Sequence, residues 1–233
     1  LQADTVIEAD IDEDPDAELI PVRDHVGTVT RIEALTPTIK GLFLRLDTPI
    51  RFQAGQYVNL EIPGLGIRRA FSLASPPSLG GEIELNVRIV PGGAGTGYLH
   101  EALKVGDTLK LSGPYGRFFV RRSARVPMLF MAGGSGLSSP RSMILDLLEQ
   151  GNPPAITLVY GQRHRGELYY HEEFEALAER HPYFSYVPVL SHEPEGSGWH
   201  GARGFVHEAA KAHFGNDFRG HKAYLCGPPP MIE

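Results

Sequence analysis

A glycine-rich turn at residues 133–136 has the composition of a phosphate-binding loop. Its sequence is Gly-Gly-Ser-Gly, and it lies between an apolar run and a segment with helical spacing that starts near Pro140. A phosphate needs backbone N–H groups that no side chain shields, and a helix N-terminus adds a favourable dipole. Ser138 or Ser139 could cap this helix, with Pro140 in its first turn. Ser139 stands where the G-x-G-x-x-G pattern has its third glycine, so a plain tight turn is the alternative.

Ser135 in this turn raises the alternative of acyl hydrolysis. A nucleophile elbow has the pattern G-x-S-x-G, and Leu137 occupies the position of its last glycine. None of the 10 histidines is linked to Ser135 by a motif. His207 and Glu208 are followed by Lys211 where the zinc motif H-E-x-x-H needs a second histidine, so no metal site is expected.

The first half of the chain contains a second candidate site. In residues 68–73 (Arg-Arg-Ala-Phe-Ser-Leu), strand alternation places Arg69 and Phe71 on one face, where a cation and a flat ring could hold one ligand. A surface arginine beside an ordinary core phenylalanine would give the same pattern. A glycine-rich turn at residues 92–96 also leads into a helical segment and so offers backbone N–H groups to an anion. One such turn in each half predicts two phosphorylated ligands.

Two halves of different periodicity must position these residues. Short alternating runs bounded by Gly, Pro and Asp predict an antiparallel sandwich or barrel over residues 22–120. The strands are expected at 27–32, 39–46, 57–62, 70–74, 83–90 and 108–111, with a helix at 96–104. After residue 126, apolar runs alternate with helical segments, which predicts βαβ units and a parallel sheet. These strands are expected at 128–132, 156–160, 186–190 and 223–226, and the helices at 140–150, 171–180 and 204–214.

Composition and charge exclude several classes of protein. Of 233 residues, 42% are hydrophobic and 21% charged, which fits one large or two ordinary soluble domains. The 22 basic and 28 acidic residues give a net charge of −6 without a basic block, so neither nucleic acid nor a membrane is expected as partner. The single cysteine, Cys226, excludes a disulfide framework and a cysteine-ligated iron–sulfur cluster within this chain, and fits a cytoplasmic location. The acidic residues 4–18 resemble a linker, and we expect a fragment cut at both ends.

Five short segments, in this order, resemble the ferredoxin–NADP reductase superfamily. Residues 69–72 (Arg-Ala-Phe-Ser) resemble its flavin motif R-x-[YF]-S. Residues 133–136 with Pro140 resemble its nucleotide loop G-G-[TS]-G-x-x-P, and residues 226–231 (Cys-Gly-Pro-Pro-Pro-Met) resemble its C-G-P-x-x-M segment. Residues 55–58 and 113–116 match further turns. The resemblance implies an antiparallel six-stranded Greek-key flavin-binding barrel followed by a parallel-sheet α/β domain. The expected bounds are 1–20 for a linker, 21–122 for the FAD-binding domain and 126–233 for the NAD(P)-binding domain.

Within the superfamily, three segments resemble most closely the reductase component of multicomponent phenol hydroxylases. They are residues 52–59, 132–148 and 222–231. Such reductases carry an N-terminal ferredoxin domain with a [2Fe–2S] cluster, which is expected upstream of this chain because residues 6–10 resemble the linker that follows it. The family's final strand and helix are expected beyond residue 233.

The resemblance also assigns roles to individual residues. Arg69 would bind the FAD pyrophosphate, Phe71 would pack on the flavin ring, and Ser72 would hydrogen-bond near flavin N5. Cys226 would lie beside the nicotinamide, although a buried small hydrophobe is the alternative. Ser72 and Cys226 are therefore the expected catalytic residues. The expected cofactor-binding residues are Arg69, Ala70, Phe71, Ser72, Gly93, Ala94, Gly95, Thr96, Gly134, Ser135, Gly136, Leu137, Gly161, Cys226, Gly227 and Pro228.

The implied activity is that of a flavin reductase. It takes a hydride from NADH and passes electrons singly, through the upstream [2Fe–2S] domain, to a phenol-type aromatic-ring monooxygenase. The arginines of residues 162–165 could pair with the 2′-phosphate of NADPH, whereas Glu193 and Glu195 would repel it, so NADH is expected and NADPH is the alternative. Two further alternatives are the reductase of a ring-hydroxylating dioxygenase or another electron-transfer chain, and a non-catalytic FAD-binding module that routes electrons or regulates.

Overall fold

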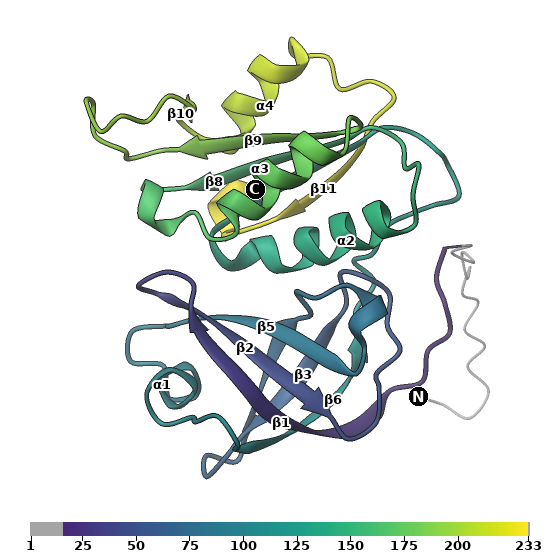
Figure 1. Cartoon of the computed structure of the whole chain (residues 1–233), viewed down its shortest axis with the longest axis vertical. Helices are drawn as coiled ribbons and strands as arrows, with labels where there is room; N and C mark the ends of the chain where they lie inside the picture. Colours follow the sequence, from purple (N-terminus) through teal and green to yellow (C-terminus); the bar gives the residue numbers. More distant parts are fainter. Residues whose placement is uncertain (1–15, 233) are drawn as a thin grey trace, which may run out of the picture.

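The computed structural model describes residues 16–232, which form two sheets stacked one above the other (Figure 1). The first sheet has six antiparallel strands in the order β4-β3-β6-β1-β2-β5. These strands are β1 (Arg23–Ala34), β2 (Ile39–Leu46), β3 (Tyr57–Ile62), β4 (Ile67–Ser72), β5 (Glu82–Arg88) and β6 (Thr108–Tyr115). An isolated bridge between Leu73 and Leu85 joins the two outer strands, so the sheet curls into a barrel.

The barrel interior is aliphatic because alternate residues of each strand point inward. Val58, Leu60 and Ile62 of β3 are almost completely buried, as are Leu42 and Leu44 of β2. Helix α1 (Ala94–Glu101) follows β5 and contributes Leu99 to the same core.

The second sheet is parallel and has the strand order β10-β9-β8-β7-β11. Its strands are β7 (Met128–Gly133), β8 (Ile156–Gln162), β9 (Phe184–Leu190), β10 (Ala202–Arg203) and β11 (Lys222–Cys226). Helices α2 (Ser138–Glu149) and α3 (His171–Arg180) pack on the face that carries Phe130 and Leu158. Helix α4 (Val206–Phe214) packs on the opposite face, which carries Leu129 and Val159. This burial on both faces explains why the strands appear as continuous apolar runs.

The two sheets share one apolar interface. Figure 1 shows α2 between the parallel sheet and the barrel. Ile39, Ala54 and Val120 from the barrel side belong to the same buried cluster as Met143 of α2. Gly55 has φ +101°, and a Cβ added to it would lie 2.1 Å from Met143 Cε and 2.3 Å from the Phe118 carbonyl oxygen. Only glycine allows α2 to approach the barrel this closely.

The fold prediction, an antiparallel barrel followed by a parallel α/β sheet, is confirmed. The two-residue strand β10 was not predicted, because two residues are too short to show a periodicity. The capping prediction for Ser138 and Ser139 is wrong: both lie inside the first turn of α2. A 3-10 turn, η2 (Gly134–Leu137), runs directly into α2, so these hydroxyls donate instead to the carbonyls of Ser135 and Gly55.

The last residues of the predicted linker contact the folded part. The Asp16 carboxylate accepts a hydrogen bond from the Ser123 N–H at 2.7 Å, and Glu18 pairs with Arg51 at 2.9 Å. The rest of the linker, residues 1–15, lies outside the described residues. Among residues 16–232, no helix combines the length and the apolar character that crossing a membrane requires.

Candidate functional site

Arg69 of β4 lies at the N-terminus of α1. Its Cγ is 3.5 Å from the Cβ position at Gly95, and its guanidinium donates to the Arg68 carbonyl at 2.8 Å. Gly93 occupies the N-cap position without a side-chain capping bond. The Thr96 hydroxyl accepts the Val90 N–H at 3.1 Å, which fixes the turn without covering the N–H groups of the helix. A cation and a bare helix N-terminus therefore face one position, and this combination fits a pyrophosphate.

The rest of the predicted flavin strand leads from this position toward the end of β4. Phe71 is half-buried and packs against the barrel core, so part of its ring stays exposed on the face that alternation gives to Arg69. Ala70 faces the opposite side and is paired with Asn59. Ser72 ends the strand opposite Tyr57, whose ring stacks on Tyr115 at 5.6 Å. The exposed edge of β4 thus carries a cation, a partly exposed ring and a hydroxyl in sequence.

The predicted nucleotide loop lies at the carboxyl end of β7. Gly134 has φ +57°, and its carbonyl accepts the Tyr169 hydroxyl at 3.2 Å. A Cβ on Gly136 would lie 2.4 Å from the Cys226 carbonyl oxygen, so this glycine allows the end of β11 to pack on the loop. Leu137 is fully buried and anchors the start of α2. Pro140 is the third residue of α2 and follows Gly136 by one position more than the family pattern has.

The structure brings the predicted loop and the Cys-Gly-Pro segment together. Cys226 pairs with Ala132 in the sheet, and Pro228 Cδ lies 3.2 Å from the Cβ position at Gly133. Gly227 packs against Met231 of the short helix α5 (Pro229–Ile232). Burial raises the pKa of the Cys226 thiol, so this side chain is neutral at pH 7.

Gly161, at the end of β8, has a packing role. A Cβ at this position would lie 2.4 Å from Val206 Cγ1 at the start of α4. The glycine therefore permits α4 to begin close to the strand end, which places its N-terminus beside the turn after β8.

The loops expected near the adenosine lie side by side at the ends of β8 and β9. The N–H groups of Ser191 and His192 donate to the carbonyls of residues 162 and 163 at 3.0 and 2.9 Å. The Glu193 carboxylate accepts the Arg165 N–H at 2.8 Å, and this backbone hydrogen bond is the main cause of a lowered pKa for Glu193. Arg203 of β10 donates to the Glu193 carbonyl at 2.5 Å. An ionised carboxylate is thus held at this edge by a backbone N–H, with the Arg203 side chain bound to the same residue.

Three polar residues of β5 lie where the barrel meets the second half of the chain, and the motif analysis did not identify them. Glu84, Asn86 and Arg88 alternate along the strand and face the second sheet. A Cβ on Gly134 would lie 3.1 Å from Arg88 Nη1, so a cation of the barrel borders the nucleotide loop. The alternation is visible in the sequence, but that sequence alone does not show which other part of the chain covers the polar face.

The hydrolase alternative finds no support in the described residues. The Ser135 carbonyl accepts the Ser138 hydroxyl at 3.1 Å, and no histidine between residues 16 and 232 is hydrogen-bonded to the Ser135 side chain. A serine nucleophile needs such a base.

The comparisons with known proteins agree with this arrangement. A model described as an oxidoreductase FAD-binding domain matches residues 27–120, and one described as an oxidoreductase NAD-binding domain matches residues 130–233. The chain is 61% identical to the reductase component DmpP of phenol 2-monooxygenase from Pseudomonas sp. strain CF600, over 99% of this chain and 65% of that protein. It is 54% identical to the phenol hydroxylase P5 protein of Acinetobacter pittii strain PHEA-2, over 100% of this chain and 66% of that protein. The chain therefore spans about two thirds of the length of these relatives.

A solved structure shows the same fold. The crystal structure of the Amycolatopsis cytochrome P450 reductase GcoB superimposes with a TM-score of 0.85 at 35% sequence identity, and the match covers 91% of this chain and 64% of that one. This chain has the antiparallel sheet before the parallel sheet, and the FAD-binding and NAD-binding family models match it in the same order. The chain belongs to the ferredoxin–NADP reductase superfamily of FAD- and NAD-binding oxidoreductases.

Proposed function

We propose that this chain is the part of a phenol hydroxylase reductase that binds FAD and NADH and transfers electrons from NADH to FAD. We further propose that residues 21–122 form the FAD-binding domain and residues 126–233 the NADH-binding domain. The electrons would leave through a [2Fe–2S] domain of the whole protein toward an oxygenase component in the cytoplasm. The 61% identity to a reductase component supports the proposed acceptor.

The observation that carries this proposal is the convergence of both candidate sites on strand β5. The Leu73–Leu85 bridge joins β5 to the end of β4, where Ser72 lies. Three residues further along β5, Arg88 borders Gly134 of the nucleotide loop. A ligand held along β4 and a ligand held by the loop would therefore meet at one interface.

The residues have separate tasks in this arrangement. Bound FAD would supply the redox chemistry, namely uptake of a hydride from NADH and release of the two electrons singly. Arg69 and the α1 N-terminus would hold the FAD phosphates, and Ser72 would offer its hydroxyl to the reacting edge of the ring. Gly134 to Leu137 and Arg88 would hold the NADH phosphates. Cys226, neutral at pH 7, would contact the nicotinamide as a small side chain and exclude water.

The test is an anaerobic visible spectrum of the purified chain with FAD, before and after NADH is added. A flavin spectrum that bleaches on addition of NADH is the expected result. A flavin that binds but stays oxidised would contradict the proposed reductase and favour a non-catalytic FAD-binding module. Failure to bind flavin would contradict the assignment of the β4 strand.

The acceptor needs a second test, because a dioxygenase reductase would bleach in the same way. The whole reductase, with its upstream domain, is mixed with a phenol hydroxylase component or with a ring-hydroxylating dioxygenase component. We expect NADH-dependent product formation with the phenol hydroxylase component. Product formation with the dioxygenase component alone would overturn the proposed acceptor.

A further inference from the structure

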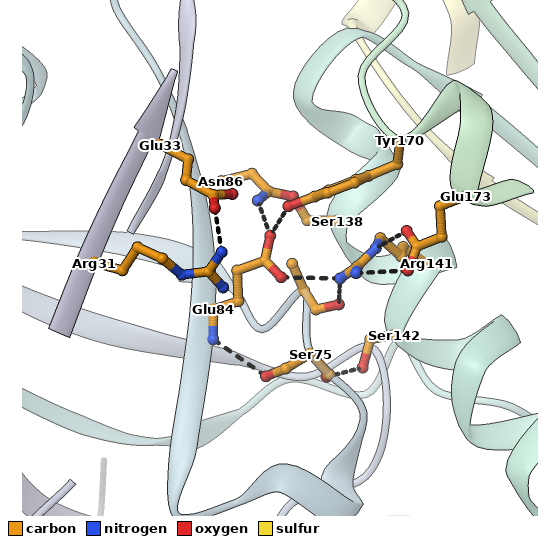
Figure 2. Close-up of polar contacts among 11 residues, drawn as sticks. Arg31, Glu33, Ser75, Glu84, Asn86, Ser138, Arg141, Ser142, Tyr170 and Glu173 are labelled. Carbon is orange, nitrogen blue, oxygen red and sulfur yellow. Dashed lines mark hydrogen bonds and ion pairs between the residues drawn. The ribbon is translucent and has the colours of Figure 1, made fainter. Parts of the chain in front are cut away.

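A buried ion pair connects the barrel to helix α2. The Arg141 guanidinium donates to the Glu84 carboxylate of β5 at 3.0 Å and to the Ala74 carbonyl at 2.9 Å (Figure 2). On its other side it forms two hydrogen bonds with the Glu173 carboxylate of α3, at 2.7 and 2.9 Å. The side chains of Arg141 and Glu84 are only 10% and 5% exposed. One guanidinium thus ties three elements of the fold together.

Tyr170, the residue just before α3, closes this cluster from the other side. Its hydroxyl donates to the Glu84 carboxylate, and the Arg141 guanidinium lies over its ring, 4.0 Å from the centroid. Tyr170 has φ +58° and ψ +20°, a left-handed conformation that a bulky residue rarely adopts. Such a conformation persists only where the surroundings enforce it. Here the ring contact with Arg141 and the hydroxyl contact with Glu84 hold the Tyr170 side chain in place.

The ion pair is the first contact of a series along β5. Asn86 donates at 2.6 Å to Glu84 Oε1, the carboxylate oxygen that also accepts the Tyr170 hydroxyl, and Asn86 accepts the Ser138 hydroxyl at 3.2 Å. Arg88 then borders Gly134. Alternate residues of β5 thus make three contacts in order: Glu84 with Arg141 of α2, Asn86 with Ser138 at the start of α2, and Arg88 with Gly134 of the loop. This series fixes the position of the loop along β5.

A buried ion pair is a weak source of stability, because two charges must be removed from water. It fixes geometry well, because a partner that moves away leaves a buried charge uncompensated. Burial alone would lower the pKa of Arg141, but the hydrogen bonds to Glu173 and the charge of Glu84 outweigh it and raise this pKa. The guanidinium is therefore charged at neutral pH.

We infer that Glu84 and Arg141 are positioning residues for hydride transfer: they hold the nucleotide loop at a fixed place against the flavin strand. This inference rests on the proposed function. Neither residue reaches the candidate FAD or NADH site itself; both act through Ser138, the loop and β5. Hydride transfer requires a narrow range of donor–acceptor geometry, and a displacement of about 1 Å can slow a reaction by about 100-fold.

The test compares three variants with a matched control. Glu84→Gln removes the charge but keeps the shape, Arg141→Lys removes the forked hydrogen bonds, and Tyr170→Phe removes one hydroxyl. Asp146→Asn is the control, because Asp146 also lies on α2 but its ion pair is with Arg122, which is not part of β5. The limiting rate of flavin reduction and the dissociation constant of NADH are measured separately by anaerobic stopped flow. Amide hydrogen exchange of residues 134–142 is measured without NADH.

We expect Glu84→Gln and Arg141→Lys to lower the limiting rate by about 10-fold or more, with a change of less than about threefold in the NADH dissociation constant. Exchange of residues 134–142 should become faster in both, and the control should match the parent in rate and exchange. A purely structural role would lower the melting temperature and leave the limiting rate unchanged. Limiting rates within about twofold of the parent, with FAD retained, would overturn the positioning role.

Two further outcomes are decided by the same set of proteins. If Glu84→Gln or Arg141→Lys loses the fold, Tyr170→Phe decides, because it removes one hydrogen bond that holds the Glu84 carboxylate in place while the Arg141–Glu84 contact still supports folding. We then expect a slower limiting rate and faster exchange, and parent values in both would overturn the inference. A parent chain that binds FAD but is not reduced would overturn the proposed function, and unchanged exchange in the variants would then overturn the positioning role independently.

Discussion

Arg69 of β4 packs on Gly95 of α1, with the arginine Cγ 3.5 Å from the glycine Cβ position. We propose that these residues, 26 positions apart, form one anion site, in which the arginine would supply the charge and the helix the N–H groups. Arg68, the preceding residue, points to the other side of the strand and pairs with Glu61 at 3.6 Å. This contrast between neighbours allows a direct test.

Arg69→Ala should weaken FAD binding. Hydrogen bonds to a charged group contribute about 1.5 to 3 kcal/mol, so the dissociation constant should rise by about 10- to 100-fold. Equilibrium titration of the FAD-free chain, followed by flavin fluorescence, measures the change. Arg68→Ala is the control and should bind FAD as the parent does. Equal dissociation constants for the two variants would contradict the pyrophosphate role of Arg69.

Arg88→Gln should weaken NADH binding more than it slows hydride transfer. The guanidinium borders Gly134, where a bound nucleotide would place a phosphate, and its loss removes one charge-assisted contact. We expect the dissociation constant of NADH to rise by about 10-fold at low salt, and the difference from the parent to shrink as salt rises. Arg45→Gln, an exposed arginine on β2, should have no effect. A salt-independent loss, or an equal loss in both variants, would exclude a phosphate contact by Arg88.

Much of the fold followed from local patterns in the sequence. Strands β2 and β3 and helix α3 lie at the predicted residues, because alternation and helical spacing are properties of the segment itself. Part of the candidate site could be predicted from the sequence, because the glycine-rich turns and the Arg-Ala-Phe-Ser motif are short and contiguous. Glu84 and Arg141 could not be paired in the same way, because they are 57 positions apart and meet only when the two sheets pack. The glycine at 136 suggested an open phosphate loop, whereas its neighbour in the structure is the Cys226 carbonyl.

Gly136→Ala should destabilise the junction of the loop and β11. The added Cβ would lie 2.4 Å from the Cys226 carbonyl oxygen, and the backbone must shift to make room. Such overpacking costs about 1 to 3 kcal/mol, which corresponds to a melting temperature lower by about 2 to 12 °C for a chain of this size. Thermal unfolding followed by circular dichroism measures this. Gly166→Ala is the control, because a Cβ there meets no atom within 4 Å, and an equal loss in both would contradict the packing argument.

Cys226→Ser should slow flavin reduction by about 3- to 10-fold while FAD binding stays unchanged. The Cys226 backbone packs on the nucleotide loop, and at this position the smaller, more polar hydroxyl should pack and exclude water less well than the thiol. An unchanged limiting reduction rate would remove Cys226 from the site.

Cys226 should also remain protonated throughout the neutral pH range. Burial raises its pKa above the ordinary value of 9.0, so the folded state favours the thiol. The contribution of the Cys226 thiol to the free energy of unfolding is fully present below its ordinary pKa of 9.0 and is lost as the pH rises through its raised pKa in the folded state. The rate of alkylation by iodoacetamide, measured against pH, should therefore have its midpoint above 9.0 in the folded chain and near 9.0 in urea. A midpoint below 8 in the folded chain would show that the thiol is activated.

Glu193→Arg should shift the preference from NADH toward NADPH. The ionised carboxylate of Glu193 lies at the ends of β8 and β9, where it would repel a 2′-phosphate, and an arginine would attract one. The ratio of kcat/KM for NADPH to that for NADH, with ferricyanide as acceptor, should rise by at least about 10-fold. The substitution has a second effect besides the change of charge, because it also removes the carboxylate that accepts the Arg165 N–H.

Glu193→Gln separates these two effects, since it keeps an oxygen that can accept the Arg165 N–H but carries no charge. We expect a ratio between those of the parent and Glu193→Arg, because repulsion is removed and no attraction is added. Glu195→Arg makes the same charge change two residues further along, and a smaller rise there would show that position, and not overall charge, decides. If Glu193→Arg and Glu195→Arg raise the ratio equally, the effect is long-range attraction, and Glu193 does not face the adenosine ribose.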